Sequence, residues 1–388
     1  MSDNPDKVNV LSVRDAELHR LRRKAWDRGL GPKALTTYQP DIQRKVDIFI
    51  KQLNERLGQS MDISKWTMYF SFDIMGRIAF SKDFHQLNEA KEHFAIAAMR
   101  DQMAQVGLMG SVPWLMHIMV RIPFLSGATK IFFDYTRKQI EQRREEWHRD
   151  ATKTPTDVIS WLLKANDEGR HLGPPGDEAL YDDGRLAIIA GSDTTGATLA
   201  NILYYLIVNP DKYRRLQKDI DEASKSGDHK SHLPYLEAII AETLRLKPVV
   251  PSGQPRETPP EGLFIDEVWI PGNINVLVPQ WVVQRDERNY KRPLEFLPER
   301  WIEEGKHLIV DDQAYFPFSI GAYACTGKQL ALLQMRTLLR RVASEFDISF
   351  APGEDGRNFD TGAKDTFTMA VPSLPVVFEK RQEPVIEQ

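Results

Sequence analysis

Helical periodicity runs through most of the chain as far as Leu246 and then stops. Up to that point apolar side chains recur at the three- and four-residue spacing of amphipathic helices, with proline, glycine and asparagine turn signals between the segments. From Lys247 onward prolines cluster and short β-rich runs replace the long helices. The pattern predicts a mainly α fold with a smaller β-rich portion. Because no internal repeat or low-complexity linker divides the chain, we expect a single domain over residues 1–388.

Individual elements follow from the same spacing and from helix start and stop signals. The predicted helices are residues 38–57, 62–80, 84–107, 128–148, 155–164, 182–208, 210–223, 233–246 and 326–346. The predicted strands are residues 263–265, 268–270, 275–279, 347–350 and 366–379.

Composition narrows the classes of protein. One cysteine rules out an intramolecular disulfide, so nothing requires an oxidising compartment and a cytosol-facing location is expected. A formal net charge of -4 gives no reason to expect a nucleic-acid partner, which calls for a concentrated basic patch. The polar start carries no secretory signal, and no apolar run is long enough for a transmembrane helix. Residues 106–125 are the candidate for a peripheral membrane contact, with a buried core segment as the alternative.

Cys325 lies in a loop that suits a bound thiolate. Gly321 and Gly327 stand four residues before and two residues after it, and Phe318 stands seven before it. A predicted helix begins directly after the cysteine, and the unpaired N–H groups of a helix N-terminus lower the pKa of a thiol. Glycine permits close backbone approach to a flat ligand, and an aromatic ring beside the sulfur limits access of water. The alternative is a buried structural cysteine at a helix start.

Three further segments carry charged or hydroxyl groups in suggestive spacing. Residues 190–195 read Ala-Gly-Ser-Asp-Thr-Thr within a long helix, where hydroxyls that bond back to helix carbonyls are the alternative to a chemical role. Glu242 and Arg245 share one helix face, and a surface salt bridge is the simpler interpretation of this pair. Residues 19–23 are basic and precede Trp26, and an exposed basic run would explain them equally well.

Taken in order, these segments resemble the cytochrome P450 family, and the resemblance covers essentially the whole chain. The cysteine loop resembles the haem-binding signature of that family, and residues 190–195 resemble its distal oxygen-binding motif. The resemblance implies a cytochrome P450 fold and a haem-thiolate monooxygenase, which inserts one oxygen atom from O2 into an apolar organic substrate. The wording of residues 70–76 and 285–288 looks closest to fungal members of secondary metabolism.

The same resemblance assigns a cofactor and the residues that would bind it. The cofactor is heme b, whose iron Cys325 would ligate, and two electrons would come from NADPH through a separate NADPH–cytochrome P450 reductase. Basic residues suit the haem propionates because arginine can donate two parallel hydrogen bonds to a carboxylate. The other predicted cofactor-binding residues are His19, Arg23, Arg256, Phe318, Gly321 and Gly327.

In the resemblance the long helix and the Glu-x-x-Arg pair have separate roles. Asp193 and Thr194 would relay protons to the distal oxygen, and small residues at 190 and 191 would leave room for dioxygen. The pair on the later helix would join an arginine of a Pro-Glu-Arg segment in a buried structural network. That predicted network consists of Glu242, Arg245 and Arg300.

Two departures from the family pattern stand out. Tyr323 occupies the position two before the cysteine, where family members often carry a basic residue, so one propionate contact is weaker or supplied elsewhere. The helix that holds His19 begins almost at Met1, whereas family members usually have roughly a hundred residues before it. We therefore expect an N-terminally incomplete domain without the usual membrane anchor, with the strand at 275–279 exposing an unpaired edge. Association with the endoplasmic-reticulum membrane would then need another contact.

Two other functions stay open from the residues alone. The first is a non-catalytic remnant of the same family that serves as a haem-binding or merely helical scaffold. The second is a cysteine-dependent hydrolase, which needs a histidine base near Cys325. The nearest histidine in sequence is His307, in a polar loop without a supporting motif.

Overall fold

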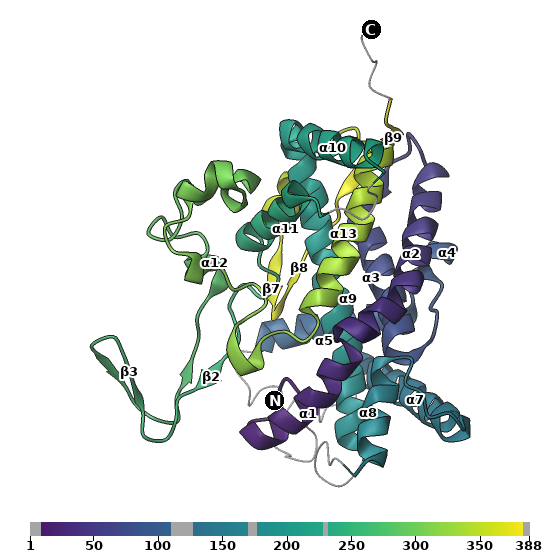
Figure 1. Cartoon of the computed structure of the whole chain (residues 1–388), viewed down its shortest axis with the longest axis vertical. Helices are drawn as coiled ribbons and strands as arrows, with labels where there is room; N and C mark the ends of the chain where they lie inside the picture. The colour runs from purple at the N-terminus through teal and green to yellow at the C-terminus, as the bar shows by residue number, and fades with distance from the viewer. Residues whose placement is uncertain (1–8, 110–126, 170–176, 228–231, 383–388) are drawn as a thin grey trace.

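The computed structural model describes residues 9–109, 127–169, 177–227 and 232–382, and helices dominate it (Figure 1). The α-helices are α1 (Ala16–Gly29), α2 (Pro32–Asn54), α3 (Ile63–Phe80), α4 (Gln86–Glu89), α5 (Phe94–Met109), α7 (Gly127–Arg149), α8 (Val158–Asp167), α9 (Glu178–Val208), α10 (Pro210–Lys225), α11 (Pro234–Leu246), α12 (Gln280–Val283), α13 (Lys328–Glu345) and α14 (Arg357–Thr361). The 3-10 helices are η1 (Pro298–Trp301), η2 (Glu303–Leu308), η3 (Asp312–Ala314) and η4 (Gly321–Tyr323).

The strands of the described residues are short and pair only with antiparallel neighbours. The largest sheet has the order β1-β9-β6, and the remaining pairs are β2 with β5, β3 with β4, and β7 with β8. The bounds are β1 (Met61–Asp62), β2 (Arg256–Glu257), β3 (Leu263–Ile265), β4 (Val268–Ile270), β5 (Asn275–Val276), β6 (Phe346–Phe350), β7 (Lys364–Thr366), β8 (Thr368–Ala370) and β9 (Pro375–Lys380).

Several helix starts are explained by local chemistry. Asp62 caps α3 by accepting a hydrogen bond from the backbone N–H of Ser64 at 3.2 Å. Asp157 and Ser160 form a reciprocal capping box at the start of α8. Proline occupies the first turn of α2, α10 and α11, where its missing N–H costs nothing.

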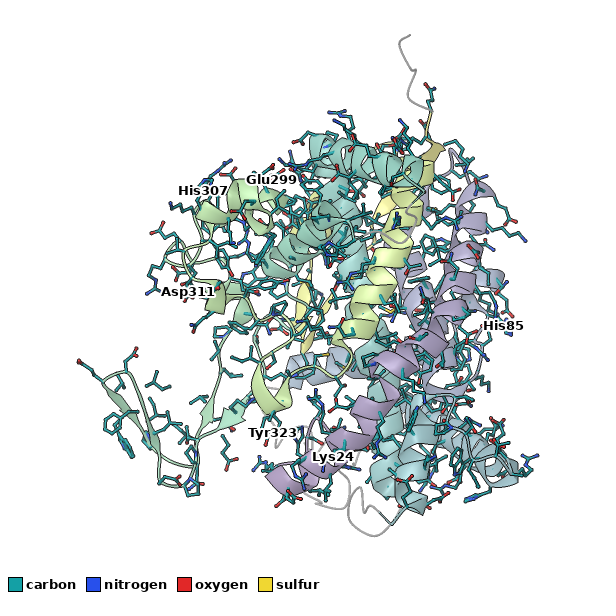
Figure 2. The ribbon with its side chains drawn as sticks, viewed as in Figure 1. Lys24, His85, Glu299, His307, Asp311 and Tyr323 are labelled. Atoms are coloured by element: carbon teal, nitrogen blue, oxygen red, sulfur yellow. The ribbon has the colours of Figure 1, made fainter. Side chains whose placement is uncertain are left out.

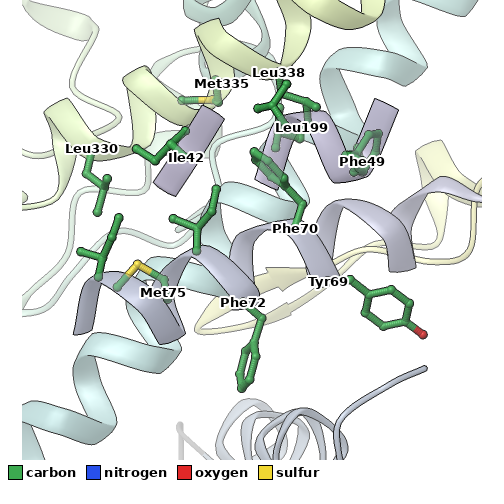
Figure 3. Packing of buried hydrophobic residues seen from close by; sticks show 14 of the residues in the cluster. Ile42, Phe49, Tyr69, Phe70, Phe72, Met75, Leu199, Leu330, Met335 and Leu338 are labelled. Atoms are coloured by element: carbon green, nitrogen blue, oxygen red, sulfur yellow. The ribbon is translucent and has the colours of Figure 1, made fainter. Parts of the chain in front are cut away.

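The core lies where α2, α3, α9 and α13 meet, and apolar side chains from all four helices interlock there (Figure 3). Burying one such side chain stabilises the fold by about 1.5–3 kcal/mol, so these four helices hold the centre of the molecule together. Residues of this cluster shown in Figure 3 include Ile42, Phe49, Phe70, Met75, Leu199, Leu330, Met335 and Leu338.

Gly191 is small because two helices approach closely at this point. A Cβ added there would lie 2.4 Å from the sulfur of Met75 in α3, so α3 and α9 could not pack at their present distance with a larger residue. Gly196 lies against α3 as well, with the Met68 Cα 3.1 Å from an added Cβ. The close approach of α3 is thus a second explanation for the glycine at 191, and the expected space for dioxygen there stays a prediction.

The predicted helix over residues 84–107 is broken into α4 and α5. His85 and Ala90 flank α4 with positive φ angles of 57 and 51 degrees, which end helical hydrogen bonding on both sides of it. The predicted strand over 366–379 is likewise divided into β7, β8 and β9, with Phe367 at φ 77 degrees in the turn between β7 and β8. The other predicted helices and strands are present with small changes at their ends.

The β3–β4 hairpin extends away from the body of the molecule (Figure 1). Its apolar side chains are largely exposed, with Phe264 at 66% and Trp269 at 51%. β5 pairs with β2 alone within the described ranges, so one of its edges is unpaired there, as the sequence predicted.

Among the described residues no helix is both long and apolar enough to cross a membrane. The predicted membrane-contact segment 106–125 lies outside the described residues from position 110 onward.

Candidate active site

The Cys325 loop joins η4 to the start of α13. The backbone N–H of Cys325 donates to the Phe318 carbonyl at 2.8 Å, and Gly321 adopts a positive φ of 75 degrees that folds the loop back. Gly327 is the N-cap of α13, and its backbone N–H and that of Lys328 donate hydrogen bonds to the Cys325 sulfur. The sulfur therefore sits at a helix N-terminus, as the sequence predicted.

Burial and hydrogen bonding act on the Cys325 thiol in opposite directions. Burial raises its pKa, and this outweighs the lowering by the Gly327 N–H, the Arg23 charge and the start of α13. The residue is nonetheless exposed to solvent. Burial and exposure are compatible, because many protein atoms surround the thiol while one side of the residue contacts solvent. The expected lowering of the thiol pKa is thus wrong for the chain alone, because desolvation is the larger effect.

Three of the predicted propionate-binding residues converge on this loop from different elements. The His19 ring of α1 lies 4.2 Å from the Tyr323 ring, centroid to centroid. The Arg256 guanidinium of β2 lies 5.6 Å from the same ring centroid. Arg23 of α1 donates to the carbonyl of Ala324 at 2.6 Å. The fold therefore gathers three basic side chains beside the cysteine, although Arg256 is more than 200 residues from α1 in sequence.

The Tyr323 ring lies at the centre of this group of basic side chains. It occupies the position where the family often has a basic residue, and both His19 and Arg256 contact its ring. Figure 2 labels Tyr323 on the loop that contacts α1 through His19 and Arg23. His19 has a lowered pKa, first because it is buried and then because Arg23 repels its charged form. Basic side chains thus surround the tyrosine, and the supply of the missing propionate contact by them stays a prediction.

Phe318 and Gly327 are the remaining predicted cofactor-binding residues of this loop. Phe318 packs against the core, and the Lys328 ammonium lies 5.7 Å from its ring centroid. A Cβ added to Gly327 would approach the Cys325 sulfur to 3.8 Å, an ordinary contact, so Gly327 is not required by a clash within the chain.

The middle of α9 presents an accessible stripe in an otherwise buried helix. Ala190 is exposed, whereas Ser192, Thr195 and the following turns are buried. Asp193 and Thr194 lie one turn beyond Ala190 and are partly accessible. The Thr194 hydroxyl donates to the Ala190 carbonyl at 2.8 Å, which is the back-bonding alternative raised from the sequence.

Asp193 has an environment that its neighbours on α9 do not share. Burial raises the pKa of its carboxyl to about 6, and a hydrogen bond from the Thr368 hydroxyl opposes that rise. Among the described residues no ion pair involves Asp193. A carboxyl in this state exchanges a proton close to neutral pH. Thr368 was missed from the sequence, because a hydroxyl in a short C-terminal strand carries no motif.

Glu242 is the centre of a fully buried network that confirms the predicted contacts. Its carboxylate accepts from Nε and Nη2 of Arg245 at 2.8 and 2.9 Å and from Nε of Arg300 at 2.9 Å. The Trp301 indole and the Leu297 backbone N–H each donate to it at 2.9 Å. The exposed salt bridge considered as an alternative is excluded, because all three charged side chains are 0% exposed.

The two arginines also bind the backbone that leads into the cysteine loop. Arg245 donates to the carbonyls of Gln284 and Pro293 at 2.7 Å each. The Trp301 and Tyr315 rings are tilted by 50 degrees with their centroids 4.3 Å apart, and Tyr315 directly precedes the Phe316–Phe318 segment. The network thus fixes the irregular chain between α12 and the cysteine.

The basic segment of α1 is divided between two environments. Arg22 is 1% exposed and lies 3.3 Å from Asp183 of α9, so it belongs to the interior and not to an exposed basic run. Burial raises the pKa of Asp183 to about 6, with Arg22 acting against that rise. The pair joins α1 to α9 and so helps to position α1, which carries His19 and Arg23, beside the cysteine loop.

The hydrolase alternative finds no support in the described residues. His307 lies with Glu299 and Asp311 at the outer edge of the molecule, far from Tyr323 (Figure 2). His19 is the histidine near the loop, and its contact there is with Tyr323.

The comparisons with known proteins match this arrangement over nearly the whole chain. The sequence profile described as "Cytochrome P450" matches residues 2–377. The chain belongs to the cytochrome P450 family. A cytochrome P450 monooxygenase of Eupenicillium brefeldianum is 34% identical over 97% of this chain and 76% of its own length. A tryprostatin B 6-hydroxylase of Aspergillus fumigatus is 35% identical over 96% of this chain and 67% of its own length.

Solved structures show the same fold at low sequence identity. The cytochrome P450DA heme domain superposes with a TM-score of 0.79 at 19% identity, covering 96% of this chain and 80% of that one. A zebra fish cytochrome P450 with abiraterone gives a TM-score of 0.77 at 20% identity, covering 97% and 84%. The predicted cytochrome P450 fold is confirmed.

Membership of the cytochrome P450 family establishes the reaction class and the cofactor. The chain is a haem-thiolate monooxygenase that uses haem iron, with electrons supplied by a redox partner, and it acts on an organic substrate. The donor set around the cysteine loop fits haem, because one thiol lies at a helix N-terminus and two arginines, opposite in charge to the propionates, gather there with the N–H donor of His19. Nothing in the site or in the comparisons favours the non-catalytic alternative.

Replacing Arg256 by alanine should weaken haem retention. A charge-assisted hydrogen bond to a carboxylate contributes about 1.5–3 kcal/mol, so we expect haem to dissociate roughly 10–100 times more readily. The rate of haem transfer to an excess of an apo-haem protein measures this. Arg20→Ala is the matched control, since Arg20 lies on α1 but pairs with Glu17 at the surface. Unchanged transfer from the Arg256 variant would contradict the assignment.

Proposed function

We propose that this cytochrome P450 is a monooxygenase of fungal secondary metabolism in which Cys325 ligates haem and Asp193 with Thr194 handles protons. The observation that carries the proposal is the convergence of α1, β2 and the cysteine loop on one face, with a partly accessible acid and alcohol on α9. The named relatives support the metabolic context, since one of them is a tryprostatin B 6-hydroxylase.

The binding residues have separable tasks. Cys325 provides the sulfur ligand, and Arg23 and Arg256 provide positive charge and N–H donors for the propionates. His19, whose pKa is lowered, provides an N–H donor. Haem, when bound, supplies the iron at which O2 is activated. The hydrogen bonds from Gly327 and Lys328 to the sulfur stabilise its negative charge and tune the centre.

Asp193 and Thr194 of α9 supply protons. With a pKa of about 6, the Asp193 carboxyl gives up a proton near neutral pH and takes another from solvent. The Thr194 hydroxyl proton is directed to the Ala190 carbonyl, so its oxygen lone pairs can accept a hydrogen bond from the accessible side. The pair can thus pass protons toward the face that Ala190 leaves open.

The electron donor, the substrate class and the cellular location are further proposals. We propose NADPH–cytochrome P450 reductase as the electron donor and an apolar organic molecule as the substrate. We further propose one domain over residues 1–388, facing the cytosol at the endoplasmic-reticulum membrane, with residues 106–125 as a peripheral contact. The continuous core and the profile match over residues 2–377 support the single domain.

The experiment that tests the function is reconstitution of the haem-loaded chain with the reductase and NADPH. A panel of fungal indole alkaloids and polyketides serves as probes, and product mass is measured. A mass gain of one oxygen atom, labelled when 18O2 is used, supports the proposal. A haem-loaded chain that consumes NADPH but labels no member of the panel contradicts the proposed metabolic context.

Asp193→Asn should stabilise the protein above pH 6 while lowering turnover. The raised pKa means that the folded protein resists ionisation of Asp193, so wild-type stability falls as pH rises from about 4 to about 6 and stays lower above that. Because the residue is partly accessible, we expect the asparagine variant to be more stable by about 1–2 kcal/mol at pH 8 and by nothing below pH 4.

Denaturant unfolding of both proteins across this pH range provides the measurement. Asp211→Asn is the control, since Asp211 lies at the exposed start of α10 and its side chain is 65% accessible. A stability difference that does not change with pH would contradict the burial argument.

A further inference from the structure

Thr368 is a buried polar residue that no step described above uses. It is 4% exposed and begins β8, 175 positions from Asp193 in the sequence. Its hydroxyl donates a hydrogen bond to Oδ2 of Asp193. In the part of the chain that the structure describes, Asp193 forms no ion pair, so this hydroxyl is the side-chain group that orients the carboxyl. Oδ1 then remains the oxygen that can exchange a proton.

Thr368 lies in the β7–β8 hairpin, whose tip has a strained backbone and is held by several hydrogen bonds. Phe367 adopts a φ of 77 degrees, a conformation that a bulky residue keeps only where its surroundings hold it. The Thr366 hydroxyl donates to the Thr368 carbonyl at 2.9 Å, and the Phe367 N–H donates to Asp365 Oδ1 at 3.0 Å. The Ser252 hydroxyl in turn donates to the other oxygen of Asp365. Thr368 is therefore fixed from within its own hairpin.

The hairpin is also fixed to the body of the molecule. The Met369 N–H donates to the Val249 carbonyl at 2.9 Å. On the other side Thr366 lies so close to α5 that a Cβ on Gly107 would be 2.6 Å from the Thr366 Cα. The position of the Thr368 hydroxyl is thus set by the chain after α11 and by α5, independently of α9.

We propose that Thr368 is a positioning residue that holds the Asp193 carboxyl in the orientation from which it passes protons along the accessible stripe of α9. The proposal rests on the proposed proton-handling role of Asp193. In the step that it serves, the carboxyl proton leaves Asp193 for an acceptor on the open face, and the carboxylate regains a proton from solvent. A hydroxyl on a fixed hairpin suits this task, because a positively charged partner would keep the carboxylate ionised.

The first test measures the hydrogen bond itself in the resting, haem-loaded protein. Infrared spectroscopy follows the carbonyl band of the protonated Asp193 carboxyl during a pH titration, and Asp193→Asn identifies that band by its loss. Thr368→Val removes the donor that favours the charged form, so the pKa of Asp193 should rise. Thr368→Ser keeps a hydroxyl and should restore the wild-type titration. Thr361→Val is the matched control, since the exposed Thr361 hydroxyl donates to the Arg357 carbonyl within α14 and not to Asp193.

The second test measures the fate of oxygen. With the reductase and NADPH but no added substrate, O2 is reduced either to hydrogen peroxide with two electrons and two protons or to water with four of each. Well-timed protons favour water, so Thr368→Val should raise the fraction of NADPH electrons recovered as hydrogen peroxide by about twofold or more. Thr368→Ser and Thr361→Val should leave this fraction near the wild-type value. If the valine variant does not retain haem, Thr368→Ala removes the same hydroxyl without a second methyl group.

The outcomes separate the two proposals. A shifted titration together with a raised peroxide fraction, both restored by serine, supports the role of Thr368. If Asp193→Asn changes the peroxide fraction and the Thr368 variants do not, the inference about Thr368 is overturned and the role of Asp193 stands. If Asp193→Asn leaves the fraction unchanged, the proposed function of Asp193 fails and the inference falls with it. An equal effect of Thr361→Val would also overturn it, since loss of a threonine hydroxyl that does not bond to Asp193 would then be sufficient.

Discussion

Cys325→Ser should abolish the thiolate signature of the haem and the monooxygenase activity that depends on it. A serine hydroxyl has a far higher pKa than a thiol and cannot supply the soft, electron-rich ligand that favours O–O cleavage. The expected result is complete loss of the thiolate-characteristic band in the reduced carbon monoxide difference spectrum. Because Cys325 is the only cysteine, no other residue of the chain can replace it as a thiolate ligand.

Ser319→Ala provides the control for damage to the loop. Ser319 adopts a positive φ in the same segment but has no contact with the sulfur in the described residues. It should keep the thiolate band. Retention of that band in the Cys325 variant would contradict the ligand assignment. Loss of a haem-independent hydrolysis would instead support the cysteine hydrolase that the sequence left open.

Glu242→Gln should destabilise the folded protein by about 3–5 kcal/mol and sharply reduce the yield of haem-loaded chain. The carboxylate accepts five hydrogen bonds, from Arg245, Arg300, Trp301 and the Leu297 backbone. Removing its charge leaves two buried guanidinium groups uncompensated, which costs far more than the loss of an exposed pair. Denaturant unfolding and the haem content of the purified protein are the measurements.

Glu237→Gln is the matched control on the same helix. Glu237 pairs with Arg336, but both side chains are partly exposed, at 24% and 37%. Such a pair contributes about 1 kcal/mol or less, so this variant should fold and bind haem normally. If Glu242→Gln changed stability no more than this control does, the network would not be the structural centre that its geometry indicates.

Local patterns were sufficient wherever the governing interaction lies within a few residues. Helical spacing located α2, α3, α9 and α13, because an amphipathic or apolar helix must bury the same face wherever it packs. The Glu242–Arg245 pair could be predicted since three residues separate neighbours on a helix face. Turn residues were harder, and His85 and Ala90 broke a predicted helix because a positive φ at these residue types leaves little trace in sequence.

Several contacts between distant segments left no signal in the sequence, although the family resemblance predicted that Glu242 and Arg300 meet. The bond between Thr368 and Asp193 joins elements 175 residues apart, and neither residue type signals the other. Gly191 was interpreted as space for a ligand, and the Met75 sulfur of α3 is a second explanation for its size. Arg22 and Arg23 are adjacent in a basic run, yet one is buried against Asp183 and the other reaches the cysteine loop.

The sequence by itself determined the family, the mainly α fold and the identity of the candidate ligand, because spacing around Cys325 and along the helices encodes local geometry. The tertiary structure decided how the charged groups contact one another and how deeply they are buried. It brought His19 and Arg256 to Tyr323, it enclosed Glu242 between two arginines, and it placed a hydroxyl against Asp193. The reason is that burial and through-space electrostatics depend on which elements pack together, and a pKa is set by that packing and not by neighbours in the chain.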